Sequence, residues 1–463
     1  MQRKENGMGG VLAAIIAGAF MPGCDTTIVA IGVPALMEAF GVGASQIQWV
    51  STVYLLALAV GVPVAGWTEH TRGGRFGWMA GLWLFLAGSV LCAVSPTLPL
   101  LVCSSAVLGF AAGMIITLMT TLPVEIAHRR GIVAVGGVMS TIMLPMSCGP
   151  IFGPVVGGII LNFASWHWIY IVNVPVVVVA IVLGARNLHD APQGERGSRP
   201  FDVVGFILVG LGMSLLLLGL GLVGQNDAPG SNALFATLAG LVCLALFVAW
   251  PRTRDPRRAF VDISLMRYRS VPTAAASIFM AGTVLYAAQF VLPIYYQDLR
   301  GSDAFTAALI LIPQGVGALL SRSIAGRLSD RHGGRIVAAV GFAAVALTTV
   351  PFLFIDPQAP MSTTAFVLFL RGLAVGALIV PITTTSYASV PDASIPDAAV
   401  IVRMFQQVGG SFGTAATAIA LASALAGSRE AVLNGFHTAF AVLVAISLVG
   451  AAASLTMPRK RSR

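Results

Sequence analysis

Long apolar stretches recur along the whole of this 463-residue chain and decide what it can fold into. A helix that crosses a bilayer needs about 20 predominantly apolar residues, and the chain supplies about fourteen such stretches between short polar loops. Hydrophobic residues make up 57% of the sequence and charged residues 10%, which excludes a soluble globular fold. We therefore expect an all-α membrane protein with spans near residues 11–33, 47–66, 76–94, 98–121, 132–161, 168–184, 203–223, 233–250, 272–296, 306–320, 336–354, 364–386, 400–424 and 436–455.

The distribution of arginine predicts how these spans lie in the membrane. If the N-terminus lies inside the cell, nearly all basic loops fall on the cytoplasmic side, as the positive-inside rule requires, and only Arg300 and Arg429 fall opposite. This bias predicts cytoplasmic N- and C-termini and an even number of spans. It also explains the net charge of +9 without a nucleic-acid partner. The cytoplasmic basic segments are 72–75, 129–130, 196–199, 252–269, 322–335 and the RKRSR tail.

One short basic loop occurs twice. It reads GWTEHTRGGR at residues 66–75 and GRLSDRHGGR at residues 326–335. A six-span unit used twice is a common plan among transporters, and it places a substrate site near the bilayer midplane between the halves. We therefore expect a six-helix bundle in residues 1–190, two additional transmembrane helices with cytoplasmic connections in residues 191–260, and a second six-helix bundle in residues 261–463.

At these loops the chain resembles the major facilitator superfamily, and within it the fourteen-span drug:proton antiporters of the EmrB/QacA type. The second copy matches the gating signature G-x-L-x-D-R-x-G-x-R of that family. The first copy departs from it, because His70 stands at the acidic position and Glu69 comes one residue early, about 100° around a helix. The resemblance implies a gating role for Gly66, Gly73, Arg75, Gly326, Asp330, Arg331, Gly333 and Arg335.

The predicted fifth span carries GPIFGPVVGG at residues 149–158, which fits the family's antiporter signature G-x-x-x-G-P-x-x-G-G. Small residues on one helical face let two helices approach closely, and a proline bends the helix. In the family this element distinguishes exporters from symporters, so the resemblance implies export. The motif residues are Gly149, Gly153, Pro154, Gly157 and Gly158.

Asp25 is the only carboxylate deep inside a predicted span. Placing a charge at mid-membrane costs about 2.5 to 3.5 kcal/mol even on the lenient insertion scale. Desolvation favours the neutral acid, which would let the group load and release a proton as a cavity switches sides. The alternative is a structural carboxylate bonded to Thr26, Thr27 or a facing helix. We take Asp25 as the first proton-coupling candidate.

Arg371, at the start of RGLAVG in a later span, is the second proton-coupling candidate. It could partner an acid, or it could be a structural anchor. The family pattern also places an arginine near Ser105 in the fourth span, where this chain has none, so that role is not carried over. Arg403 and Gln406 could face a cavity, but an arginine near a span end is commonplace at the membrane interface.

A cavity for drug-like molecules needs apolar and aromatic walls with few polar groups. Tryptophan and tyrosine also form belts at the membrane interface, and the belt is the favoured interpretation for Trp49. The candidate substrate-binding residues are Asp25, Trp49, Tyr54, Tyr286, Gln289 and Tyr296.

Missing motifs exclude other energy sources and chemistries. The only lysines are Lys4 and Lys460, so the chain has no phosphate-binding G-x-x-x-x-G-K-[ST] loop and ATP is not its direct fuel. The zinc-protease motif H-E-x-x-H is absent, and we do not expect an enzyme. The five cysteines lie inside predicted spans without metal-ligand or disulfide spacing. We therefore expect no metal and no cofactor, with protons as the coupling ion.

These observations predict proton-coupled efflux of drug-like or amphipathic small molecules by alternating access. The alternative is a proton-coupled symporter or facilitator of a small metabolite with the same fold, because fold does not dictate function. The expected partners are the substrate and the lipid bilayer, and the sequence names no accessory export protein. Abundant alanine, glycine and arginine with two lysines indicate a GC-rich bacterial source, hence the bacterial inner (plasma) membrane.

Overall fold

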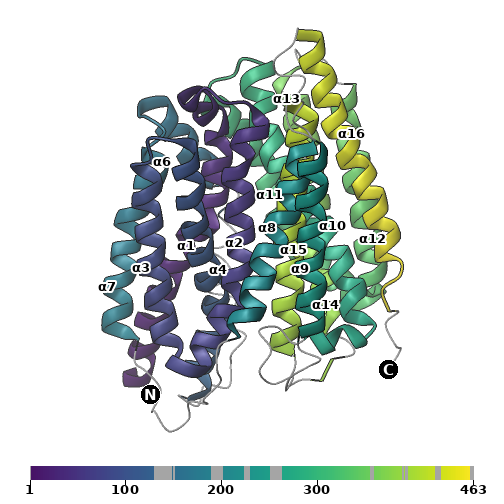
Figure 1. Cartoon of the computed structure of the whole chain (residues 1–463). Helices are drawn as coiled ribbons and strands as arrows, with labels where there is room; N and C mark the ends of the chain where they lie inside the picture. The colour runs from purple at the N-terminus through teal and green to yellow at the C-terminus, as the bar shows by residue number, and fades with distance from the viewer. Residues whose placement is uncertain are drawn as a thin grey trace.

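The computed structural model is all-helical, with long helices that run side by side (Figure 1). It describes residues 2–129, 149, 152–188, 202–223, 230–250, 263–354, 359–387, 390–391, 395–422 and 429–458. Among these residues, 10 helices are long and apolar enough to cross a membrane, and shorter apolar helices lie at Phe152–Phe163, Val203–Leu216 and Ser231–Phe247. An all-helical, multi-span membrane protein with about fourteen helical segments is thus confirmed. The exact number of spans stays a prediction.

The N-terminal bundle occupies the purple-to-blue side of Figure 1. Its outward faces expose large apolar side chains such as Trp83 (56% exposed) and Val179 (53% exposed), as expected of a surface in contact with lipid. Its inward faces bury a continuous apolar core. Its helices are α1 (Gln2–Phe40), α2 (Ala44–Arg72), α3 (Gly74–Ala93), α4 (Leu98–Arg129), the helix Phe152–Phe163, α6 (Trp168–Ile171) and α7 (Asn173–Asn187).

The C-terminal bundle occupies the green-to-yellow side of Figure 1. Helix α15 (Ile395–Ala422) is long but is not among the 10 helices that are apolar enough to cross a membrane. It carries Arg403, Gln406 and Gln407. The other elements are η4 (Ile263–Arg267), α10 (Ser270–Ile294), η5 (Tyr295–Leu299), α11 (Ala304–His332), α12 (Gly334–Thr349), η6 (Val350–Leu353), α13 (Met361–Gly376), α14 (Ile379–Ser386) and α16 (Arg429–Ser454).

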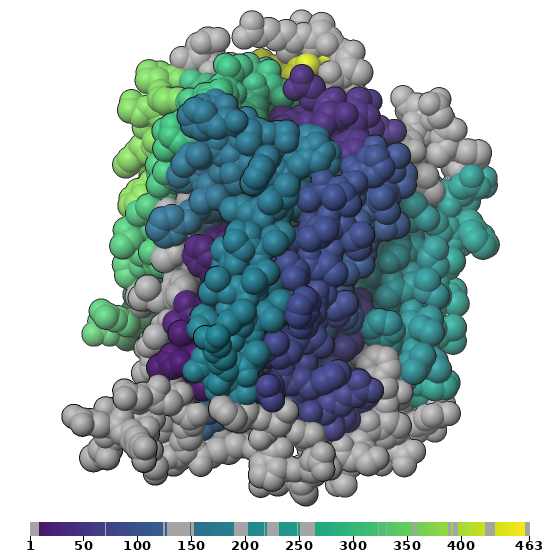
Figure 2. Space-filling view, turned by 90° about the vertical axis from the view of Figure 1, so that its left-hand side faces the viewer, coloured from purple at the N-terminus to yellow at the C-terminus, as the bar shows by residue number. Residues whose placement is uncertain are grey.

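A helical hairpin, α8 (Val203–Val223) with α9 (Gly230–Ala249), packs on the outside of both bundles. Val209 of α8 belongs to one apolar cluster with Val60 of α2 and Met404 of α15. Figure 2 shows this hairpin (teal) at one edge of the molecule and the C-terminal bundle (green) at the other. The predicted domain boundaries at residues 190 and 260 lie outside the described residues.

Helix α1 begins and α16 ends at the same end of the molecule (Figure 1), which we call the terminal end, opposite the far end. Which side of the membrane each end faces stays a prediction. The α2–α3 and α11–α12 turns also lie at the terminal end, and each uses a glycine with positive φ, Gly73 (+96°) and Gly333 (+83°). The two loop copies therefore have the same backbone turn.

The internal repeat extends into the helix contacts. A Cβ on Gly109 of α4 would collide with the carbonyl oxygen of Tyr54, and a Cβ on Gly372 of α13 would collide with that of Gln314. Positions 54 and 314 have the same offset as the two loops. One turn later the same relation joins Gly113 to Leu58 and Gly376 to Ala318. Close glycine contacts therefore give both bundles one helix-packing plan.

Candidate functional site

A large cavity lies between the two bundles. It encloses about 2070 Å³ of empty space, part of it continuous with solvent. Its wall runs from Pro293, near the far end of α10, to Val380 at the start of α14 and Arg403 in the terminal half of α15. The cavity therefore extends from near the far end of α10 toward the terminal end.

At the far end the two bundles meet. Gln297 Nε2 of η5 donates to the carbonyl oxygen of Ile31 in α1, at 3.1 Å. Gly158 lies so close to α11 that a Cβ there would be 2.9 Å from the carbonyl oxygen of Ala304. These contacts join the bundles at the far end of the cavity, whose wall includes Ile31.

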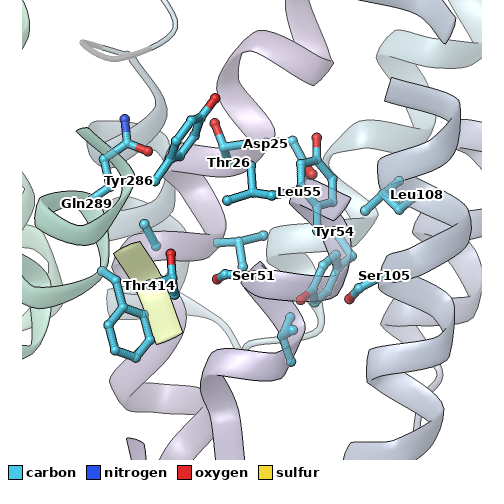
Figure 3. A pocket seen from close by; sticks show the side chains of 15 residues that line it. Asp25, Thr26, Ser51, Tyr54, Leu55, Ser105, Leu108, Tyr286, Gln289 and Thr414 are labelled. Atoms are coloured by element: carbon cyan, nitrogen blue, oxygen red, sulfur yellow. The ribbon is translucent and has the colours of Figure 1, made fainter. Parts of the chain in front are cut away.

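A smaller pocket of about 480 Å³ adjoins the large cavity (Figure 3). Thr26, Ala30, Tyr286 and Gln289 line both spaces, so they form the wall between them. Figure 3 shows Asp25 next to Thr26 in the small pocket, and Asp25 is not among the residues that line the large cavity. The other polar groups of this pocket are Ser51, Tyr54, Ser105, Tyr170 and Thr414.

Asp25 is 0% exposed, and in the described part of the chain its carboxyl group accepts a hydrogen bond from Asn173 and interacts with the neighbouring Tyr54 hydroxyl. Its Oδ1 accepts from Asn173 Nδ2 of α7 at 2.8 Å, and the same nitrogen donates to Ser89 Oγ of α3 at 3.3 Å. Among the described residues Asp25 Oδ2 has no hydrogen bond of normal geometry, and neither does the buried hydroxyl of Tyr54 in the same pocket. The carboxylic acid thus has one oxygen held and one available for a proton.

The helix Phe152–Phe163 packs on the segment of α1 that carries Asp25. Thr27 Oγ1 donates to the carbonyl oxygens of Cys24 at 2.7 Å and Gly149 at 3.3 Å. A Cβ on Gly149 would collide with the carbonyl oxygen of Gly23, and one on Gly153 with the Thr27 hydroxyl. Pro154 lines the large cavity, Gly157 packs on Ile31, and Gly158 packs on α11. The glycine motif is therefore held between α1 of its own bundle and α11 of the other.

Arg371 of α13 is 1% exposed and lies within the C-terminal bundle. Its Nε donates to Thr349 Oγ1 and its Nη1 to Gln314 Oε1, each at 3.3 Å. Its hydrogen-bond partners in the described chain are thus a hydroxyl and an amide. Gln314 lines the large cavity, so Arg371 lies one residue behind the cavity wall.

The structure divides the candidate substrate residues. Tyr286 and Gln289 line both spaces, while Asp25 and Tyr54 line the small pocket. Trp49 and Tyr296 line neither space. Tyr296 is fully buried, and the Arg300 Cζ lies 5.9 Å from the centroid of its ring. Their substrate role stays a prediction.

Sequence reasoning missed several polar residues of the large cavity. Arg322 was assigned to a cytoplasmic loop, but α11 continues to His332 and carries Arg322 into the cavity wall. The signal was span length, because the predicted span 306–320 is shorter than the roughly 20 residues that a crossing needs. The amide partner Asn173 was visible in the segment SWHWIYIVNVPV. The other missed cavity residues are Gln314 and Gln407, whereas Arg403 and Gln406, which the sequence offered but ranked below other candidates, do line the cavity.

The gating-loop residues lie at the terminal end of the helices. Arg75 Nη2 donates to the carbonyl oxygen of Ala185 at the end of α7, at 3.4 Å. Glu69, the acid that comes one residue before the signature's acidic position, accepts a hydrogen bond at its Oε2 from Thr121 Oγ1 of α4 at 2.9 Å. Arg331 is exposed, and the side chain of Asp330 lies outside the described residues.

Residues 409–413 read GGSFG, which has the spacing G-x-S-x-G of a hydrolase nucleophile. That chemistry needs a strand-to-helix turn that presents the serine. Ser411 instead lies inside α15, where its hydroxyl is 3.2 Å from the carbonyl oxygens of both Thr52 and Gln407. The serine therefore joins α15 to α2.

Comparison with known proteins adds the following findings. A family model described as Major Facilitator Superfamily matches residues 15–414. The "Multidrug resistance protein B homolog" of Mycobacterium tuberculosis (strain ATCC 25618 / H37Rv) is 32% identical over 422 residues, 89% of this chain and 75% of that protein. The "Putative multidrug resistance protein MdtD" of Escherichia fergusonii is 29% identical over 422 residues, 91% and 87% of the two chains. A crystal structure of a D-xylose-proton symporter superposes with a TM-score of 0.68 at 14% identity, over 98% of both chains, which shows the fold.

Proposed function

Because this chain belongs to the Major Facilitator Superfamily, we propose that it exports amphipathic, drug-like molecules in exchange for protons. The family and the fold indicate a membrane transporter rather than a catalytic enzyme. The multidrug-resistance names of the two relatives support a drug-like substrate. The fourteen-span antiporter branch and a bacterial inner membrane are part of the same proposal.

Asp25 carries the proton step. It is fully buried, its Oδ2 has no hydrogen bond of normal geometry in the described chain, and Thr26, Tyr286 and Gln289 line both its pocket and the large cavity. In such a site the neutral carboxylic acid has a smaller desolvation cost than the charged carboxylate. A change in access from one side of the membrane to the other therefore changes how readily it holds a proton.

The glycine-motif helix links this proton to the gate. Gly149 and Gly153 press on α1 beside Asp25, and Gly158 presses on α11 of the other bundle. Tightly packed interfaces are bistable rather than continuously deformable, so a small shift of α1 is passed to α11.

The cycle follows alternating access. With the terminal end on the cytoplasmic side, the cavity of this state receives substrate from inside, and the contacts of Gln297 and Gly158 close the far end. Rocking of the two bundles opens the far end, substrate leaves, and Asp25 takes a proton from outside. The return step releases that proton inside.

The test is efflux of a fluorescent dye from energised cells, with and without a protonophore, for the wild type and Asp25→Asn. We expect the wild type to lose concentrative efflux when the protonophore is added. Asp25→Asn should lose it without protonophore, because the amide takes no proton yet keeps the size and a hydrogen-bonding oxygen.

Asp303→Asn is the matched control. Asp303 is an exposed N-cap of α11 whose Oδ1 accepts from the Thr306 backbone amide, and asparagine is an equally good cap. Full efflux in Asp25→Asn, with both variants inserted equally, would refute the assignment of the proton to Asp25. Proton-driven uptake by the wild type would replace export with symport.

A further inference from the structure

The two sides of the large cavity differ in chemistry. The N-terminal bundle contributes small and apolar residues with two threonine hydroxyls, Thr26 and Thr27. The C-terminal bundle contributes two guanidinium groups, Arg322 and Arg403, together with side-chain amides. Among the described residues that line this cavity there is no aspartate or glutamate. The described lining of the cavity therefore has basic side chains on one side and acidic side chains on neither.

Arg403 lies well inside its helix, away from the helix end. It follows Ile395, the first residue of α15, by about two turns, a rise of about 12 Å. Its Nε is buried and has no hydrogen-bond partner in the described chain. A desolvated guanidinium donor without an acceptor costs free energy, and an acceptor from a bound molecule would remove that cost.

Gln314 presents a donor to the same space. Its Oε1 accepts from Arg371 Nη1 at 3.3 Å, so the amide oxygen is held toward the bundle interior. The free end of the amide is then its NH₂ group, and Gln314 lines the cavity. A buried cation thus fixes an amide so that it offers hydrogens rather than an oxygen.

Asp25, the buried acid of the adjoining pocket, does not line the large cavity and is therefore not placed to bind a cationic substrate there. Asp25 lies beyond the wall of Thr26 and Tyr286, in the small pocket, and one of its oxygens is bound by Asn173. A Cβ on Gly410 would collide with the ring of Tyr286, so this ring lies tightly against α15 on the side of Arg403. Asp25 lines the small pocket, Arg403 lines the large cavity, and Tyr286 lines both.

We propose that the cavity binds amphipathic organic anions, with Arg403 as the main contact of a carboxylate, sulfonate or phosphate and with Arg322 and Gln314 as further donors. The apolar body of the molecule would lie on the N-terminal wall. This inference rests on the proposed export function, whose substrate class it narrows from drug-like molecules in general to anions.

Binding to purified protein in phosphatidylcholine nanodiscs tests it without energisation. The probes are dansylamino-undecanoate and its methyl ester, which differ in one negative charge. We expect the wild type to bind the carboxylate at least about tenfold more tightly than the ester, because a hydrogen bond between charged partners is about twice as strong as a neutral one. Arg403→Gln should reduce this ratio to about twofold, and Arg403→Lys should retain part of it.

Arg269→Gln is the matched control, because Arg269 is an exposed arginine just before α10. It should keep the tenfold preference. Equal binding of acid and ester by the wild type, or an unchanged preference in Arg403→Gln, would overturn the proposal. Displacement of the probe by phosphatidylglycerol in the nanodisc would identify a lipid headgroup instead of a free amphipathic anion.

The two proposals fail separately. Asp25→Asn should still prefer the carboxylate while losing proton-driven efflux. If the protein shows energised efflux but binds the carboxylate and the ester equally, the export function is supported and the anion site is refuted.

Discussion

In the N-terminal bundle the Asp25 carboxylate is bound by Asn173, which also donates to Ser89 of α3. In the C-terminal bundle the Arg371 guanidinium donates to Thr349, at the end of α12. Ser89 and Thr349 occupy the same position in the repeat, with the offset that separates Gly66 from Gly326. The same repeat position therefore contributes a hydroxyl to the hydrogen bonds around a buried acid in one bundle and around a buried base in the other.

The difference shows which features the repeat determines. Glycines press helices together in the same way in both bundles, as Gly109 does on Tyr54 and Gly372 on Gln314. The residue before each glycine differs, Leu108 in α4 and Arg371 in α13. The backbone plan is symmetric, and the side chains divide the work. In our proposal the N-terminal half handles the proton and the C-terminal half the substrate.

Leu108→Arg gives the N-terminal half the residue of its repeat partner, and we expect the largest effect from it. Leu108 lines the pocket of Asp25, so an arginine there would pair with the carboxylate and hold it ionised. Concentrative efflux should fall to background while binding of the carboxylate probe persists. Leu108→Met, which conserves volume, is the control and should keep efflux. Wild-type efflux in Leu108→Arg would contradict the proton role of this pocket.

Gly149→Ala and Gly409→Ala test the symmetry of the scaffold. A Cβ at either position would collide with a backbone carbonyl, of Gly23 or of Phe279. Each substitution should destabilise the protein by about 1–3 kcal/mol through overpacking, seen as a similar fall in the thermal unfolding midpoint in detergent. Gly210→Ala in α8 is the control, because a Cβ there meets nothing within 4 Å. A fall confined to one of the two bundles would break the symmetry.

Arg371→Met tests whether the buried base serves substrate rather than proton. Without Arg371 the amide of Gln314 is free to turn, so probe affinity should fall by about threefold to tenfold, near the value of one hydrogen bond. Efflux should remain sensitive to protonophore. Titration of probe fluorescence and the protonophore assay on the same variant provide both readouts. Unchanged probe affinity together with loss of the protonophore sensitivity of efflux would instead assign Arg371 to proton coupling.

The charge carried per cycle gives the smallest expected effect. One proton in and one anion out move two charges, worth about 4.6 kcal/mol per 100 mV, against about 2.3 kcal/mol for a neutral molecule. In vesicles without a pH gradient, efflux of the carboxylate probe should depend about twice as steeply on an imposed potassium diffusion potential as efflux of the ester. Equal dependence would contradict export of the anion.

Hydropathy and glycine spacing predict the scaffold well, because lipid imposes continuous apolar helices and close helix contacts need small residues. Helix α8 spans Val203–Val223, as its apolar stretch predicts, and both loop copies turn at the predicted glycines. Asp25 was also identifiable, since a lone acid in an apolar stretch is conspicuous. Features that repeat or that violate the apolar pattern are therefore readable from sequence.

The cavity wall was harder to predict because it depends on which way each helix face turns. Arg322 and Arg403 lie toward the ends of apolar stretches, where arginine is ordinary, and only the packing of α11 and α15 turns them toward the cavity. Asn173 is far from Asp25 in sequence, and the pairing of α7 with α1 brings them within 2.8 Å. Tertiary packing decides both cases.

Substrate counterflow compared with proton-driven efflux in the same proteoliposomes tests the division of labour most directly. Counterflow exchanges labelled for unlabelled substrate and needs binding and rocking but no net proton movement. Asp25→Asn should retain counterflow of the carboxylate probe and lose proton-driven efflux, whereas Arg403→Gln should lose most of both. Loss of counterflow in correctly inserted Asp25→Asn, together with full transport by Arg403→Gln, would contradict the assignment of proton and substrate to different halves.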